Sequence, residues 1–118
     1  MKLTIKEQER LMMFTIAEMS RRRWKRGWKL NYIEAMAIIC DELLERAREG
    51  KSNIYDLVEL GSKIITEEDV MEGTPSLMPI IMLEVMFPDG NKLVTVQDPV
   101  RLEKREEAVP VDELLTMN

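Results

Sequence analysis

The chain has 118 residues, the length of one ordinary domain, and a net charge of −5. It contains no histidine, the side chain most used for proton transfer near neutral pH and the commonest metal ligand. A single cysteine excludes an intrachain disulfide and a paired-cysteine metal site, and catalysis by a Ser-His-Asp or Cys-His arrangement is excluded as well. These exclusions favour a chain that works together with other chains.

The first predicted element is a helix that begins after Thr4. Thr4 and Glu7 form a capping box, and Gly27 is suited to end the helix. Apolar side chains follow at helical spacing, with Phe14 beside the stripe: Leu11, Met12, Ile16 and Met19. The chain has ten methionines, which we interpret as flexible apolar filler in preference to metal or redox ligands.

A second helix is predicted from Asn31, capped with Glu34, to Gly50. Its first half is apolar nearly all round, so we expect it to be central in the fold, with Cys40 as buried filler. In its second half we expect the charged side chains to be exposed, namely Asp41, Glu42, Glu45 and Arg46.

A third helix is predicted over residues 53–65. Gly61 either weakens it or lets two helices approach closely. Residues 66–69 resemble the start of a one- or two-turn helix, with acids where the helix dipole is positive. Residues 73–75 are expected to stop that helix.

The remaining pattern predicts a β-hairpin, with strands over residues 80–87 and 92–97 and a turn at 88–90. Seven of the eight residues of the first strand are apolar, whereas a strand with one face in water should alternate. One face can lie on the helices, so we expect another chain to cover the other. The alternative is that residues 101–118 fold back over it. In that segment, residues 101–107 are charged and expected to be solvated.

Together these elements predict an α+β fold: a helical bundle of three to four helices followed by one antiparallel β-hairpin. The N-terminal residues do not form a signal segment, and the longest apolar stretches are shorter than the roughly 20 residues of a membrane span. With the lone Cys40, this predicts a cytoplasmic protein that does not bind a membrane.

Several blocks, in order, resemble the gamma subunit of bacterial three-chain urease. They are Lys29-Leu30-Asn31-Tyr32 with Glu34-Ala35, Ala47-Arg48-Glu49-Gly50-Lys51, Asp69-Val70-Met71-Glu72-Gly73 with Pro75, and Phe87-Pro88-Asp89-Gly90 with Lys92-Leu93-Val94-Thr95-Val96 and Pro99. The resemblance implies a gamma-like domain at residues 1–100 and a tail or linker-like extension at residues 101–118. Two positions depart from the family: Ile33 stands where proline is usual, and Gln97 where histidine is usual.

The resemblance implies a non-catalytic structural subunit of the enzyme that hydrolyses urea to ammonia and carbamate. In that family the alpha chain holds two nickel ions through histidines, an aspartate and a carbamylated lysine. The gamma chain packs with beta and alpha chains in a unit repeated three times. We therefore expect no catalytic, cofactor-binding or metal-binding residue in this chain. The expected subunit-interface residues are Leu30, Asn31, Tyr32, Ile80, Met82, Met86, Phe87 and Gln97.

The residues also leave two other functions open. Residues 1–31 have a net charge of +6 and residues 32–118 one of −11, which can mark a site for nucleic acid, a membrane or a negative partner surface. The basic, Trp-containing segment Arg21–Lys29 could bind nucleic acid, but it also suits a helix C-terminus, and the overall negative charge opposes such binding. An independent enzyme could use the carboxylates Glu67, Glu68, Asp69 and Glu72, although the helix dipole explains their position without catalysis.

Overall fold

The structure, a computed structural model, describes residues 2–110. Four α-helices precede a two-stranded antiparallel sheet in this part of the chain, which confirms the predicted α+β fold. The elements are α1 (Ile5–Lys25), α2 (Tyr32–Glu49), α3 (Ile54–Gly61), the 3-10 turn η1 (Glu67–Asp69), α4 (Thr74–Leu77), β1 (Ile80–Phe87), β2 (Gly90–Gln97) and the 3-10 turn η2 (Arg105–Glu107).

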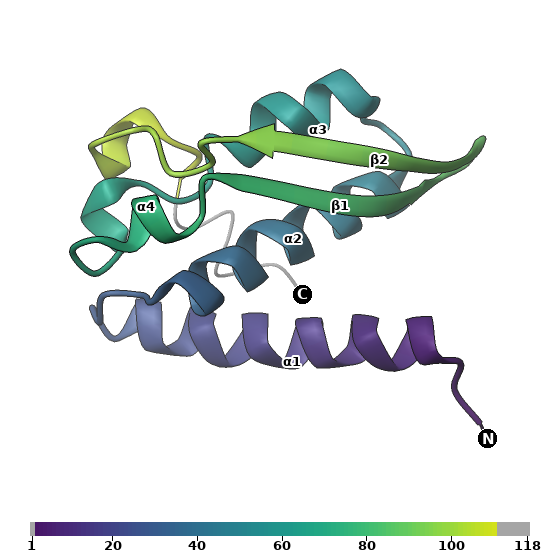
Figure 1. The fold of residues 1–118 in the computed structure, drawn as a ribbon, viewed down its shortest axis with the longest axis horizontal. Coiled ribbons are helices and arrows are strands. Elements are labelled where there is room, and N and C mark those ends of the chain that lie inside the picture. The colour runs from purple at the N-terminus through teal and green to yellow at the C-terminus, as the bar shows by residue number, and fades with distance from the viewer. Residues whose placement is uncertain (1, 111–118) are drawn as a thin grey trace.

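Helix α2 lies between α1 and the hairpin, so the molecule has α1 on one outer side and the sheet on the other (Figure 1). The strands pair from Ile80 with Gln97 to Phe87 with Gly90, and α3 packs against β2. The core is formed where α2 meets the hairpin and the segments around it. Its largest fully buried apolar side chains are Leu30, Ile38, Ile39, Leu43, Leu57, Ile64, Ile65, Met78, Val85 and Val94.

Local signals placed the starts of α1, α2 and α3 and the ends of α1 and α2 correctly. Thr4 Oγ1 accepts from the Glu7 backbone N–H at 3.1 Å, and the Thr4 N–H donates to Glu7 Oε1 at 2.9 Å. Asn31 and Glu34 repeat this arrangement at 2.8 and 3.0 Å. Gly50 closes α2 with φ +83°, a backbone conformation that glycine adopts without steric cost. Each N-cap stabilises its helix by about 1 kcal/mol.

Helix α3 ends at Gly61, and the prediction that it continues to residue 65 was wrong. A Cβ at Gly61 would lie only 2.7 Å from Val96 Cγ2, so the helix backbone is pressed against strand β2. The close approach is therefore to the sheet and not to another helix. The prediction that residues 73–75 stop a helix was also wrong, because α4 begins at Thr74 with Pro75 in its first turn, where proline is tolerated.

The start of the C-terminal segment runs beside η1 and is hydrogen-bonded to it. The backbone N–H groups of Glu67 and Glu68 donate to the carbonyls of Leu102 and Glu103, at 2.8 and 3.2 Å. The expectation that residues 101–107 are solvated was thus wrong in part, since Leu102 is half-buried. Residues 101–110 do not cover the outer face of the hairpin, and residues 111–118 lie outside the part that the structure describes.

Candidate subunit interface

Helix α1 packs on α2 through charged side chains. Arg21 Nη2 donates to Asp41 Oδ2 at 2.6 Å and to Glu42 Oε1 at 2.9 Å, and all three side chains are buried. Arg10 donates to Asp41 Oδ1 at 2.8 Å and to Glu45 Oε1 at 2.7 Å. The expectation that Asp41 and Glu42 are exposed was therefore wrong, because these acids are the partners of two arginines on α1.

The buried charges have shifted proton affinities. Burial raises the pKa of Glu42, and the nearby Arg21 and Arg46 offset this only in part. Glu42 Oε2 has no hydrogen-bond partner in the described residues. Burial opposes the charge of Arg21, but Asp41 and Glu42 raise its pKa, so the guanidinium stays protonated. Burial also raises the pKa of Cys40 to about 11, which makes this thiol unreactive at neutral pH.

Because Arg10 and Arg21 face inward, many of the apolar side chains of α1 face outward, although Ala17 and Trp24 are buried. Leu11 is 54% exposed and Met12 is 62% exposed, and Phe14 and Met19 are also exposed. The interpretation of the methionines as core filler was wrong for most of those described. The exposed ones are Met12, Met19, Met71, Met82 and Met86, whereas Met78 is buried.

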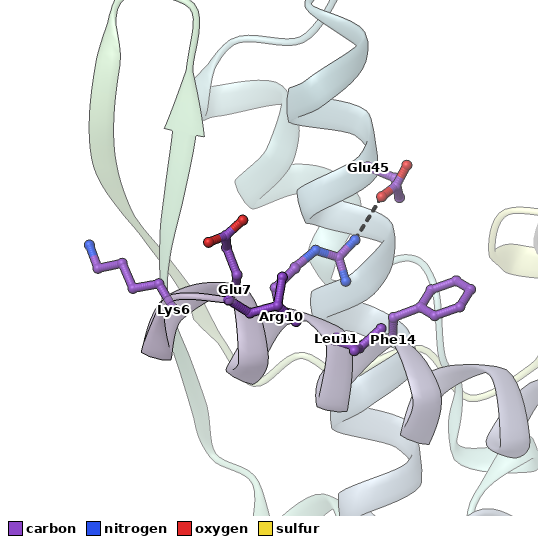
Figure 2. A pocket seen from close by; sticks show the side chains of 7 residues that line it. Lys6, Glu7, Arg10, Leu11, Phe14 and Glu45 are labelled. Atoms are coloured by element: carbon purple, nitrogen blue, oxygen red, sulfur yellow. Dashed lines mark hydrogen bonds and ion pairs between the residues drawn. The ribbon is translucent and has the colours of Figure 1, made fainter. Parts of the chain in front are cut away.

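A hollow of about 560 Å³ lies beside the N-terminal half of α1. Figure 2 shows Arg10 reaching from α1 to Glu45 on α2, while Leu11 and Phe14 line the hollow. Lys6, another lining residue, pairs with Glu84 of β1 at 3.1 Å. The hollow thus combines apolar walls with charges that the chain already pairs internally, as expected for a surface that meets another protein.

The outer face of the hairpin is a second exposed apolar surface. Met82 is 62% and Met86 is 72% exposed, with Ile80 and Leu93 also exposed, whereas Val85 is fully buried. The division of β1 into one face on the helices and one uncovered face is as the sequence predicts. In the described residues nothing covers this second face.

The structure places the other expected interface residues differently. Leu30 and Phe87 are buried in the chain's own core, and Leu30 forms a short bridge with Val70. Asn31 serves as the N-cap of α2, and Tyr32 is exposed beside it. Gln97 is exposed at the end of β2, where its backbone carbonyl accepts from Arg101. Of these, only the exposed side chains offer surface to a partner.

Much of the basic segment 21–29 is used within the chain. Besides Arg21, Arg23 donates to Glu34 at 2.6 Å, and the Trp24 indole N–H donates to Asp69 Oδ1 at 3.1 Å. Trp24 is buried, so it cannot stack on a base. These contacts remove three of the side chains on which a nucleic-acid site would depend.

The acidic group around η1 has a structural role at its centre. Asp69 Oδ2 accepts from the Thr66 hydroxyl and from Arg105 Nη1, both at 2.8 Å. The other oxygen, Oδ1, accepts from the Trp24 indole N–H. Within residues 2–110 no group of three or more carboxylate or cysteine side chains could hold a metal ion. With no histidine in the chain and Asp69 already paired, these residues do not fit the nickel that the family implies.

Sequence reasoning missed the outward face of α1. The signal was present, because Arg10 and Arg21 are separated by eleven residues, or three helical turns, and therefore share one face of the helix. Asp41 and Glu42, two acids in the middle of α2, were their natural partners. No helix in the described part of the chain is long and apolar enough to cross a membrane.

The chain is similar to known proteins over most of its length. The family described as "Urease, gamma subunit" matches residues 1–100. The chain is 50% identical over 107 residues to a urease subunit gamma of Natronomonas pharaonis, covering 91% of this chain and 97% of that protein. It is also 50% identical over 101 residues to the urease subunit gamma/beta of Pseudomonas syringae pathovars syringae and tomato, covering 86% of this chain but only 43% of those relatives. The chain belongs to the urease gamma subunit family.

Proposed function

We propose that this chain is a structural subunit that assembles with urease beta and alpha chains, and that the assembly hydrolyses urea to ammonia and carbamate. The observation that carries the proposal is the pair of exposed apolar surfaces, on α1 and on the outer face of the hairpin, in a chain of the urease gamma family. Apolar surfaces of this kind mark protein interfaces in soluble proteins.

The chemistry of the assembly belongs to another chain in this proposal. Urea hydrolysis in this family uses nickel that is held by histidines, and this sequence contains no histidine. The nickel site is therefore assigned to the alpha chain, and the chain alone is expected to be inactive. The relatives named gamma/beta carry a beta portion together with the gamma portion, which supports the beta chain as a partner.

We further propose that three such units repeat around a three-fold axis in the cytoplasm. The reduced, buried Cys40 agrees with a reducing compartment. Of the expected interface residues, the proposal retains those whose side chains are exposed. They are Asn31, Tyr32, Ile80, Met82, Met86 and Gln97.

The test is co-expression of this chain with the beta and alpha chains of the same source, followed by size measurement, nickel analysis and a urease assay. We expect a stable complex that contains all three chains and is active only when they are together. Urease activity of the purified chain alone, or its failure to enter any complex with the beta and alpha chains, would contradict the proposal.

A further inference from the structure

The outward side of α1 carries one continuous line of side chains that the chain does not use. Leu11, Thr15, Met19, Arg22 and Arg26 follow at spacings of four, four, three and four residues, which places them on one side of a helix. We call these five residues the outer seam of α1. The seam is apolar toward the N-terminus and basic toward the C-terminus, and Met12 lies beside Leu11.

The seam lies opposite the contacts with α2. Arg10, Ala17 and Arg21 face inward and are buried or half-buried, whereas the seam residues are exposed. Neither Arg22 nor Arg26 forms an ion pair within residues 2–110, and Arg26 rests only over the Trp28 ring, at 5.8 Å. In Figure 1 the side of α1 that faces away from α2 has no other element of the described residues over it.

We propose that the outer seam of α1 docks an acidic amphipathic helix of another urease chain. This inference rests on the proposed function and adds the chemistry of the partner. Apolar residues of the partner helix would lie on Leu11, Met12 and Met19, and its carboxylates would lie opposite Arg22 and Arg26. Because the seam residues follow at spacings of three and four, they form a row about 22 Å long on the helix surface. Rows of this kind pack against the side chains of a second helix.

A second copy of this chain is the wrong partner for the seam because of charge. In an antiparallel pair of seams, Arg26 of one copy would lie opposite Leu11 of the other and Arg22 opposite Thr15, so neither arginine would meet a carboxylate. In a parallel pair, the arginines of the two copies would face each other. The first arrangement leaves the arginines unpaired and the second brings like charges together, whereas an acidic segment complements the basic end.

A membrane or a nucleic acid fits the seam less well. A helix on a membrane surface keeps its cations on the face away from the lipid. Here Arg22 and Arg26 lie on the same line as Leu11 and Met19, so insertion would drag both charges into the apolar layer. A nucleic acid would leave the apolar half of the seam in water, because phosphates contact only the basic half.

The test uses the purified full chain and the beta and alpha chains produced without it, with affinity measured across a salt series. One variant is Arg22→Glu with Arg26→Glu, and its control is Arg48→Glu with Lys51→Glu, which reverses one exposed cation in the last turn of α2 and one just after that helix. A second variant is Leu11→Gln with Met12→Gln, and its control is Leu77→Gln on α4, which is also exposed. Circular dichroism confirms that each variant is folded.

We expect both seam variants to bind the beta and alpha chains about tenfold or more weakly than the wild type. The affinity of the charge-reversal variant should also depend less on salt concentration. Both controls should bind like the wild type. Seam variants that bind like their controls would overturn the seam proposal and leave the proposed function standing. Wild-type chain that does not bind the beta and alpha chains would overturn both. If the chain sediments with phosphatidylserine vesicles and the charge-reversal variant does not, the seam is a membrane-binding surface and this proposal is overturned. If the chain retains an oligonucleotide and the charge-reversal variant does not, the seam is a nucleic-acid-binding surface, which also overturns the proposal.

Discussion

At the scale of single residues, the contact between α1 and α2 depends on Arg21. Its guanidinium bonds two buried carboxylates, Asp41 and Glu42, and its own side chain is buried. Removing one member of a buried ion group leaves the others without water or partner, which costs far more than the group contributes when it is intact. The neighbouring Arg22 is exposed and has no such partner.

Arg21→Ala is expected to lower the free energy of unfolding by about 3–5 kcal/mol, because it removes the hydrogen-bond donor of two buried carboxylate oxygens, Asp41 Oδ2 and Glu42 Oε1. Arg22→Ala is the matched control and should change stability by less than about 0.5 kcal/mol. Urea denaturation of both variants measures the difference. Equal effects of the two substitutions would show that Arg21 is not the centre of the contact.

Glu42 gives the contact a dependence on pH. Burial raises its pKa in the folded state above the ordinary value of 4.5. The folded state therefore holds this proton more tightly than the unfolded state. Its contribution to stability is complete below pH 4.5 and is lost as the pH rises through the higher, folded value.

Glu42→Gln removes this titration while it keeps the size of the side chain. We expect the stability of the variant relative to wild type to improve as the pH rises above 4.5, since only the wild type must then bury a carboxylate. Denaturant unfolding at a series of pH values measures this. A relative stability that is flat or falls with rising pH would contradict the assignment of the shift to Glu42.

At the scale of elements, the junction of α3 with the hairpin is limited by space. Gly61 lies against Val96 of β2, whereas the sequence predicted either a weakened helix or the close approach of two helices. The two capping boxes, in contrast, were predictable because each depends on residues three apart in the chain. The hairpin was predictable for the same reason, since its turn and its alternation are local.

Gly61→Ala is expected to destabilise the protein by about 1–3 kcal/mol, although alanine favours helices, because the added methyl group would overlap Val96. Tyr55→Ala, at an exposed position of the same helix, is the control and should have a small effect. Thermal unfolding followed by circular dichroism compares them. A stabilising Gly61→Ala would mean that helix propensity outweighs the close contact.

At the scale of the whole molecule, the segment that follows residue 100 contacts the C-terminal end of α1 and the region of η1. Arg105 bonds Asp69 Oδ2 and the Ile64 carbonyl, at 2.8 and 2.6 Å, and lies 5.3 Å over the Trp24 ring. The Val109 N–H donates to the Lys63 carbonyl at 2.9 Å. These contacts join the C-terminal end of α1, η1 and the segment at residues 101–110 into one unit.

Arg105→Ala is expected to lower stability by about 2 kcal/mol, because the buried Asp69 loses a charged partner. It should also expose Trp24 to water, which shifts tryptophan fluorescence toward longer wavelength. Lys104→Ala, at an exposed neighbouring position, serves as the control. Unchanged stability and fluorescence in Arg105→Ala would indicate that the segment is not bound as the structure shows.

The sequence alone determined most of the elements, though not the end of α3 or the start of α4, and it also determined the hairpin with one uncovered apolar face and the family. Caps, turns, alternation and motif blocks are properties of neighbouring residues. Only the tertiary structure decided which way α1 faces. Its apolar stripe suggested core packing, yet Arg10 and Arg21 turn inward because Asp41 and Glu42 stand opposite them on α2. A buried charge is tolerated only when its partner is in place, and partners twenty or more residues apart meet only after the chain has folded. The outer seam of α1 follows from that choice.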